Sequence, residues 1–178
     1  MKERNINEES VITANGAIWV DWMIREWAES GGITPYSPDL INPASINLRL
    51  DRKCVNMHDD HEFHLKDQGE EELDWIIKGD AILATTIEYV CMPENATGTL
   101  YLRSGAARRG LDHALAGFID PGFEGEITLE LHAHRPYKIW YGLPMIQLVL
   151  TSTAGFPEKS YRVTGHYNGQ RGPTKARS

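Results

Sequence analysis

The densest group of basic residues in the chain lies in the segment RSGAARRGL, residues 103–111. Arg103, Arg108 and Arg109 stand close together there, although the formal net charge of the protein is −7. Ser104 adds a hydroxyl donor, and Gly105 lets the backbone come close to a ligand. Forked guanidinium donors beside a hydroxyl and a bare backbone suit a phosphate group. The segment is therefore a candidate anion site, with a basic surface turn as the alternative interpretation.

Two carboxylates that could activate water follow in the segment AGFIDPGFEGEITLEL, residues 116–131. Asp120 begins a DPG turn, where a carboxylate often does no more than cap the backbone. In the strand expected next, apolar and polar residues alternate, so that Glu130 lies off the core face. Two interpretations of Glu130 stay open at this point. It is either one of several solvated strand acids, or a carboxylate that faces a pocket and takes a proton from water.

Metal-dependent chemistry has weaker support. Zinc-dependent deaminases need a Cys or His cluster that includes a CxxC pair, and the chain has only Cys54 and Cys91, far apart in sequence. His58, His61 and His64 recur at intervals of three, a spacing that can bind a metal. Their acidic, aperiodic surroundings favour a solvated surface instead. We therefore expect no zinc and no metal ligands supplied by the protein.

Length and composition predict one globular domain over residues 1–178. Hydrophobic residues make up 41% and charged residues 24% of the chain, which is ordinary globular usage. No apolar run exceeds four residues, and the start MKERNINEES has no apolar stretch, so we expect neither a membrane span nor a secretory signal. Two cysteines are too few for a disulfide framework, which fits a cytoplasmic location. The acidic balance argues against nucleic acid as a partner.

The elements that must position these residues are mainly β. One helix is expected over Ala17–Glu29, with a tryptophan-rich stripe for the core and Gly31 and Gly32 as the stop signal. Short strands separated by Gly, Pro, Asn and Asp predict an antiparallel barrel or sandwich. The expected strands are Ile46–Leu50, Ala81–Val90, Thr97–Arg103, Glu126–His134, Tyr137–Tyr141 and Met145–Thr151.

Three segments lack the pattern of a packed element. Residues 1–15 are polar and irregular, and are expected to form a loose N-terminal extension. Residues 58–74 contain eight acids and one lysine without apolar periodicity, which indicates a solvated excursion. Residues 156–178 are rich in Gly, Pro and basic side chains, and are expected to form a mobile tail that orders on contact with a ligand or surface.

Taken together, the segments resemble the dCTP deaminase family within the wider trimeric dUTPase superfamily. The AGFIDPGFEGEITLEL block and the GQRGPT tail are highly specific, and the tail is most similar to that of the deaminases that convert dCTP to dUMP. The other matching segments, in the family's order, are INPASINLRL (41–50), ILATTIEYV (82–90), RSGAARRGL (103–111), GLPMIQLVL (142–150) and YNGQRGPTKARS (167–178).

This resemblance implies a fold, an assembly and a cofactor. The fold would be a distorted jelly-roll β-barrel of the dUTPase-like type with an N-terminal helix. The assembly would be a homotrimer with active sites at the subunit interfaces, closed by the tail 156–178. Mg²⁺ would accompany the nucleoside triphosphate and would not be a catalytic metal fixed by the protein.

The resemblance also implies roles for individual residues. Glu130 matches the family's catalytic glutamate, with Ser104 and Arg108 as its catalytic partners. Asp120 matches the carboxylate with which the dUTPase branch activates water. Phe123 matches the aromatic under the deoxyribose. The substrate-binding set would be completed by Arg103, Gly105, Arg109, Ala116, Phe118, Tyr161, His166 and Gln170, of which Ala116 would read the pyrimidine edge and Gln170 would close over the phosphates.

The chain departs from the family pattern at several of these places. Gly105 replaces a second serine and gives the RSG sequence typical of dUTPases. Leu115 replaces a small hydroxyl residue, in a loop that is one residue short. His166 stands where a phosphate-binding lysine is usual, and Asn47 replaces an aspartate. These changes affect the preference between dCTP and dUTP more than the fold.

Three functions follow as hypotheses. The leading one is deamination of dCTP with diphosphate release to give dUMP, in which Glu130 activates the water and Asp120 serves the diphosphate step. The second, which depends on the RSG sequence, Asp120 and Leu115, is a dUTP diphosphatase without deaminase activity. The third is a nucleotide-binding regulator that has lost turnover.

Overall fold

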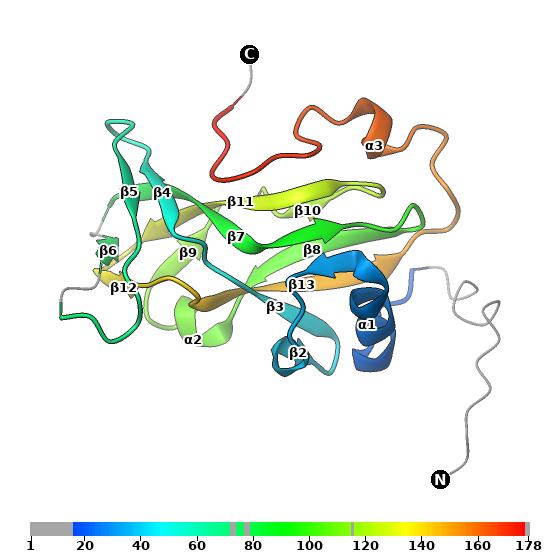
Figure 1. Cartoon of the computed structure of the whole chain (residues 1–178), viewed down its shortest axis with the longest axis horizontal. Coiled ribbons are helices and arrows are strands. Elements are labelled where there is room, and N and C mark those ends of the chain that lie inside the picture. Colours follow the sequence, from blue (N-terminus) through cyan, green and yellow to red (C-terminus); the bar gives the residue numbers. More distant parts are fainter. Residues whose placement is uncertain (1–15, 72–73, 77–78, 115, 177–178) are drawn as a thin grey trace, which may run out of the picture.

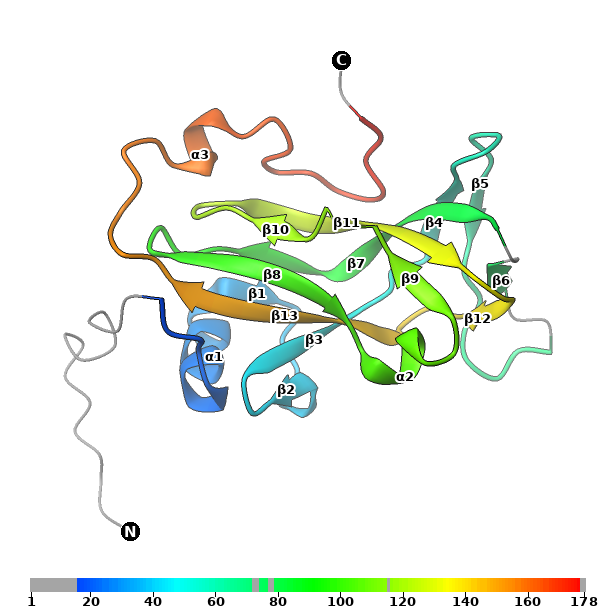
Figure 2. The ribbon, with the colours of Figure 1, turned by 180° about the vertical axis from the view of Figure 1, so that it is seen from behind.

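The apolar residues along the strands face inward from two antiparallel sheets, which are shown in Figure 1 and from behind in Figure 2. The computed structural model describes residues 16–71, 74–76, 79–114 and 116–176. The first sheet has the order β5–β4–β7–β11–β9, with β1 also paired to β7. Its strands are β1 (Ile33–Thr34), β4 (Lys53–Asn56), β5 (Glu62–His64), β7 (Ala81–Cys91), β9 (Leu111–His113) and β11 (Glu124–Ala133).

The second sheet has the order β10–β8–β13–β3–β2, and a separate pair joins β12 to β6. These strands are β2 (Ile41–Asn42), β3 (Ser45–Arg49), β6 (Asp74–Ile76), β8 (Ala96–Leu102), β10 (Phe118–Ile119), β12 (Tyr137–Ile139) and β13 (Pro144–Ser152). The helical elements are short: α1 (Asp21–Trp27), η2 (Ala28–Gly32), η3 (Pro38–Leu40), α2 (Ser104–Ala107) and α3 (Tyr161–Thr164).

The inward faces of both sheets share one hydrophobic core. Leu129 and Leu131 of β11 and Leu148 and Leu150 of β13 are all almost fully buried within it. Strand alternation leaves every second residue of β11 on the outer face, where Glu126, Thr128 and Glu130 lie. The mainly β architecture with an N-terminal helix is therefore confirmed, as is the alternation that puts Glu130 off the core.

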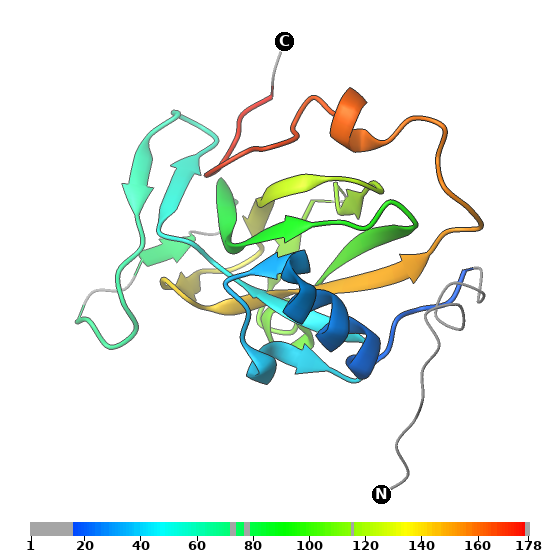
Figure 3. The ribbon, with the colours of Figure 1, turned by 45° about the vertical axis from the view of Figure 1, so that its right-hand side comes forward.

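The C-terminal segment covers the outer face of this first sheet. After β13 the chain forms α3 and then runs over β7 and β11, on the side away from α1 (Figure 1, Figure 3). Gly125 permits this close approach, because a Cβ there would lie only 3.0 Å from Phe123 and 3.1 Å from Gln170. Residues 1–15 of the expected N-terminal extension and the last two tail residues lie outside the described residues.

The helix predicted over Ala17–Glu29 starts later than expected. Ile18 forms an antiparallel bridge to Thr151, and the Trp19 backbone N–H donates to Leu150 O at 2.9 Å. Pairing with β13 therefore outweighs the helical pattern in the first four residues. The helix then continues past Glu29 through the η2 turn, which ends at the glycine pair with Gly31 at a φ of +95°.

The segment 58–74 is not wholly an excursion, and that prediction was wrong in part. Glu62–His64 forms β5, which pairs with β4, and Asp74 begins β6. The strand β5 lies at a sheet edge with its side chains largely exposed, so that its sequence shows no apolar alternation. The three histidines at 58, 61 and 64 are exposed, as the solvated interpretation requires.

β7 of the first sheet has a bulge at the point where it contacts β3 of the second sheet. The register of β7 against β11 shifts between Glu126 and Thr128, and Thr86 stands in for the missing backbone pairing by accepting the Ile127 N–H at 3.0 Å. Within the bulge, Glu88 is fully buried and accepts the Arg49 Nε–H at 2.6 Å and the Arg49 backbone N–H at 2.8 Å. This ion pair ties β7 of the first sheet to β3 of the second. Burial raises the pKa of Glu88, and the bonds from Arg49 oppose that rise.

Removal of the Arg49 side chain should destabilise the fold. Arg49→Met leaves a buried carboxylate without its counter-ion, and we expect a loss of about 3 kcal/mol in the free energy of unfolding at pH 7. Because the pKa of Glu88 is raised in the folded state, its protonated form is favoured there, and part of the loss should be recovered as the pH falls. Urea denaturation at pH 7 and at lower pH measures both effects. Lys53→Met, which breaks the exposed pair with Glu62, is the control, and an equal loss there would contradict this account.

Candidate active site

The outer face of β11 and the C-terminal segment enclose a pocket of about 580 Å³ around Glu130. We call it the Glu130 pocket. β11 supplies its floor, the turn between β10 and β11 one wall, and the tail and the tip of the β4–β5 hairpin the others. The lining residues are Met57, Asp60, Leu83, Leu100, Ala116, Phe118, Ile119, Asp120, Phe123, Ile127, Thr128, Glu130, Tyr161, Tyr167, Gln170, Thr174, Lys175 and Ala176.

The carboxylate of Glu130 is only partly hydrated. Its side chain is 26% exposed, and Oε2 is buried without a hydrogen-bond partner among the described residues. Burial raises the pKa of Glu130, with weaker opposing effects from its own backbone N–H and from His132. A desolvated carboxylate that opens into a pocket is suited to take a proton from water and to return it.

His113 is the nearest ionisable neighbour of Glu130. It lies on β9 opposite Leu131, and its Nε2 is 3.7 Å from Glu130 Oε2. Its Nε2 is also buried without a partner in the described part of the chain. Burial lowers the pKa of His113, so the imidazole is held towards its neutral form. The pair therefore offers two polar atoms, 3.7 Å apart, that a water or a ligand atom could satisfy.

Aromatic residues form the opposite end of the pocket. The Phe123 and Tyr161 rings are 5.8 Å apart with an interplanar angle of 54°. The Tyr161 backbone N–H donates to Pro121 O at 3.1 Å, which fixes the start of α3 on the DPG turn. Asp120 opens that turn and its exposed side chain lines the same pocket. The pocket thus contains an apolar platform between two carboxylates, Glu130 and Asp120.

A second pocket of about 600 Å³ contains most of the basic motif, and we call it the Ser104 pocket. Arg103, Ser104, Gly105 and Arg109 line it, beside β13 and the residues around Trp140. Arg103 donates from Nη1 to Pro144 O at 3.0 Å. The hydroxyl, guanidinium groups and glycine expected at an anion site therefore do converge.

Most of the residues singled out in the sequence thus fall into two groups. Ala116, Phe118, Phe123, Tyr161 and Gln170 join Glu130 and Asp120 in the Glu130 pocket. Within a single chain, the four residues of the Ser104 pocket do not meet Glu130.

Two residues lie in neither pocket. Arg108 is exposed, and its carbonyl accepts Arg135 Nη2 at 3.1 Å. His166 is exposed on the tail. Leu115 lies outside the described residues.

Sequence reasoning missed His113 and the far wall of the Glu130 pocket. Asp60 comes from the acidic segment 58–74, which was expected to be a solvated excursion, and Met57 directly precedes that segment. Lys175 Nζ lies 2.7 Å from Asp60 Oδ1. A single His after a Gly-Leu-Asp sequence has no distinctive spacing, so nothing in the sequence identified His113. The contact between a hairpin and a tail more than 100 residues later is likewise invisible without the fold.

Metal-binding groups and membrane-spanning helices were considered in the sequence as well, and the described residues contain neither. In the parts of the chain that the structure describes, His, Cys, Asp and Glu form no group of three or more suited to a metal ion. None of the described helices is long and apolar enough to cross a membrane.

Comparison with known proteins identifies the family. Residues 18–153 match a family model described as dCTP deaminase-like. A Streptomyces griseus protein named dCTP deaminase, dUMP-forming, is 39% identical, over 82% of this chain and 86% of that protein. A Mycobacterium avium protein of the same name is 40% identical, over 83% of this chain and 87% of its own length.

A solved structure shares the fold. The 2′-deoxycytidine 5′-triphosphate deaminase of Agrobacterium tumefaciens superposes with a TM-score of 0.67 at 19% identity, over 78% of this chain and 48% of that one. The jelly-roll fold expected from the sequence is thus confirmed. The chain therefore belongs to the dCTP deaminase-like family.

Proposed function

We propose that this protein deaminates dCTP and also releases diphosphate, so that dCTP is converted to dUMP. The observation that carries the proposal is the partly desolvated Glu130 carboxylate, whose pKa is raised by burial, on the floor of a pocket of about 580 Å³. The names of the relatives at about 40% identity support the same reaction. The proposal includes dCTP as the substrate and the roles given below to Glu130, His113 and Asp120.

The deamination step needs one water and one base. Glu130 takes a proton from the water, whose oxygen bonds to C4 of cytosine. Glu130 delivers this proton to N3 of the ring, then takes the proton of the new C4 hydroxyl and gives it to the amine. The C4–N bond breaks as the C4=O bond forms, and the products are ammonia and dUTP. The neutral His113 imidazole, 3.7 Å from Glu130 Oε2, is placed to orient the carboxylate or the water. Phe123 and Tyr161 give the sugar and base an apolar surface that also keeps water out.

Diphosphate release needs a second water at the α-phosphorus. Asp120, an exposed carboxylate in the same pocket, is the base that we assign to this step. Mg²⁺ prefers phosphate oxygens and several retained waters, so the triphosphate itself would hold the ion without a ligand from the protein. When bound with the nucleotide, Mg²⁺ would neutralise phosphate charge. The water oxygen bonds to the α-phosphorus, the Pα–O bond to the diphosphate breaks, and the products are dUMP and diphosphate.

We further propose a homotrimer in which the Ser104 pocket of one subunit completes the Glu130 pocket of another. The division of the expected catalytic set between two pockets supports this assembly. So does the outer face of β8 and β13, which lacks charge: Thr97, Thr99, Tyr101, Gln147, Val149 and Thr151 lie there. Tyr101 is 56% exposed and Phe118 of the adjacent β10 is 63% exposed, as expected for a face that another subunit covers. Arg108, exposed in one chain, would then reach a neighbour's substrate.

Two further features of the proposal concern access and location. The segment 156–178 would close the Glu130 pocket, since its residues from Tyr161 to Ala176 contribute to the lining. We propose a cytoplasmic location, because two cysteines in the chain are too few for a disulfide framework. We propose neither nucleic acid nor a membrane as a partner.

A second candidate function is dUTP diphosphatase activity without deamination. Asp120 lies in the pocket and Gly105 replaces a serine, which favours the diphosphatase chemistry over the base-directed chemistry. A nucleotide-binding regulator without turnover is the third outcome of the same test.

Purified protein with Mg²⁺ and either dCTP or dUTP separates these functions. We expect ammonia and dUMP from dCTP. Glu130→Gln should abolish ammonia release, because the amide cannot accept the proton of water, and the protein should remain folded since a desolvated charge is removed. Diphosphate from dUTP without ammonia from dCTP would support the second function, and binding without products the third. Ammonia release by the variant at the wild-type rate would refute the role of Glu130.

The acid limb of the kcat profile for ammonia release should lie above pH 4.5, the ordinary pKa of a glutamic acid. The base must be ionised, and burial raises its pKa, so protonation disables it at a higher pH than for a solvated glutamate. Below that pKa the rate should fall about tenfold per pH unit. Circular dichroism over the same range controls for unfolding. A flat rate down to pH 4.5 would contradict the desolvated pocket.

A trimer with shared sites should weigh about 60 kDa in light scattering, three times the 20.1 kDa chain. When Glu130→Gln and Arg108→Ala chains are co-expressed in equal amounts, about one quarter of the sites should combine an intact Glu130 with a neighbour's intact Arg108. We therefore expect activity near a quarter of wild type from two inactive variants. No recovery in mixed trimers would show that both residues act within one chain.

A further inference from the structure

The C-terminal segment is hydrogen-bonded to the outer face of β11 at Glu124, Glu126 and Thr128, the alternate residues that precede Glu130. Gly169 N–H donates to Glu124 O at 2.6 Å, and Thr174 N–H donates to the Thr128 hydroxyl at 3.1 Å. A parallel bridge joins Gly125 to Gln170 between these two contacts. The segment therefore runs alongside β11 as a strap that ends beside the Glu130 pocket.

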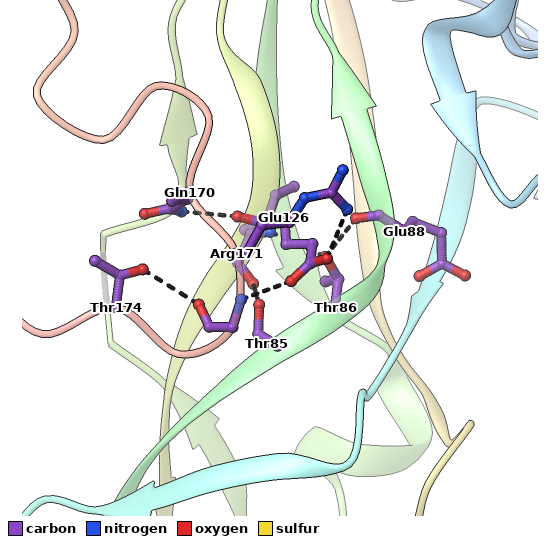
Figure 4. Close-up of polar contacts among 9 residues, drawn as sticks. Thr85, Thr86, Glu88, Glu126, Gln170, Arg171 and Thr174 are labelled. Atoms are coloured by element: carbon purple, nitrogen blue, oxygen red, sulfur yellow. Dashed lines mark hydrogen bonds and ion pairs between the residues drawn. The ribbon is translucent and has the colours of Figure 1, made fainter.

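Glu126 makes the most contacts with this strap (Figure 4). Its carboxylate accepts Arg171 Nη1–H at 2.9 Å and Gly172 N–H at 2.6 Å, one on each oxygen. Its backbone carbonyl accepts Gln170 Nε2–H at 2.7 Å, and its N–H donates to Gln170 O at 3.0 Å. The Glu126 side chain is 14% exposed and that of Arg171 is 66% exposed. The charge-assisted bond from the Gly172 N–H is therefore the more sheltered of the two that the carboxylate accepts.

Tyr89 completes the contact from the neighbouring strand. It is the register partner of Glu126 on β7, and the Arg171 guanidinium lies 4.0 Å above its ring. The β7 bulge begins directly beyond this pair, where Thr85 and Thr86 take over the pairing of Ile127. Arg171 is thus held between a carboxylate and an aromatic ring at a fixed point of the sheet.

We propose that Glu126 is a positioning residue that latches the C-terminal segment over the Glu130 pocket. This inference rests on the proposed function for its effect on turnover, but not for its effect on the segment itself. Gln170, Thr174 and Lys175 line the pocket and are attached on either side of the latch. A second ion pair of this segment, between Lys175 and Asp60, is formed by two exposed side chains and contributes little. Loss of the latch should therefore open the pocket wall without unfolding the barrel.

The latch should act on substrate affinity more than on the chemical step. If substrate binds productively only when the segment is closed, the apparent dissociation constant rises in proportion as the closed fraction falls. A bound triphosphate adds its own contacts to the segment, so that saturating substrate restores closure. A tenfold increase in the opening of the segment corresponds to about 1.4 kcal/mol. We therefore expect Glu126→Gln to raise KM for dCTP by up to about tenfold and to change kcat less than about threefold. Glu126→Asp, which keeps a carboxylate, should recover part of the loss.

Hydrogen exchange of the nucleotide-free protein tests the latch without any turnover. Glu126→Gln should increase the opening of the segment 167–176 about tenfold, while exchange in β8 and β13 stays as in wild type. Asp67→Asn is the matched control, because it breaks the 2.7 Å ion pair between Asp67 and Arg52, two residues that themselves line neither pocket, and it should change neither exchange in the tail nor KM.

Unchanged tail exchange in Glu126→Gln would overturn the latch, as would an equal rise in exchange throughout the barrel, which would show a general stabilising role. A fall in kcat with unchanged KM would also overturn it. If the wild-type protein released no ammonia from dCTP, the proposed function would fail, and the exchange result would still decide whether Glu126 holds the segment.

Discussion

The withdrawal of one carboxylate from water is the constraint on which the rest of the site depends. Glu130 lies on a strand whose other face is in the core, so that it cannot move away from the position that β11 gives it. Its Oε2 and the Nε2 of His113 lack partners in the described part of the chain. A buried polar atom without a partner costs free energy, and a fold keeps such a pair only where the atoms serve another purpose. Burial raises the pKa of Glu130, which suits the role of base that we propose for it.

The rest of the fold limits the hydration of the Glu130 carboxylate and fixes its position in the pocket. The Arg49–Glu88 pair connects the two sheets at the bulge of β7, with the Glu88 carboxylate fully buried. The tail in turn covers the pocket from Tyr161 to Ala176. Each layer is held by a different interaction: apolar packing in the core, an ion pair between the sheets, and charge-assisted hydrogen bonds between Glu126 and the tail.

Much of the fold and part of the site follow from local patterns. The alternation of apolar and polar residues in ITLEL was sufficient to predict that Glu130 lies off the core face. The DPG sequence likewise predicted the turn that Asp120 opens before β11. The start of the helix was wrong because Ile18 pairs with Thr151, a partner 133 positions away that no local pattern contains. His113, Asp60 and Lys175 were missed for the same reason, since they meet the pocket only through long-range pairing. The acidic segment was misjudged because an exposed edge strand has no apolar face to reveal it.

The most direct test of the account is the titration of Glu130 itself. In nucleotide-free protein labelled with ¹³C at the glutamate side chains, the Glu130 carboxyl resonance, assigned by its absence from Glu130→Gln, reports the pKa of this one group. A desolvated pocket predicts a midpoint above 4.5, the ordinary value. A midpoint at or below 4.5 would mean that the carboxylate is solvated, and would contradict its assignment as the base.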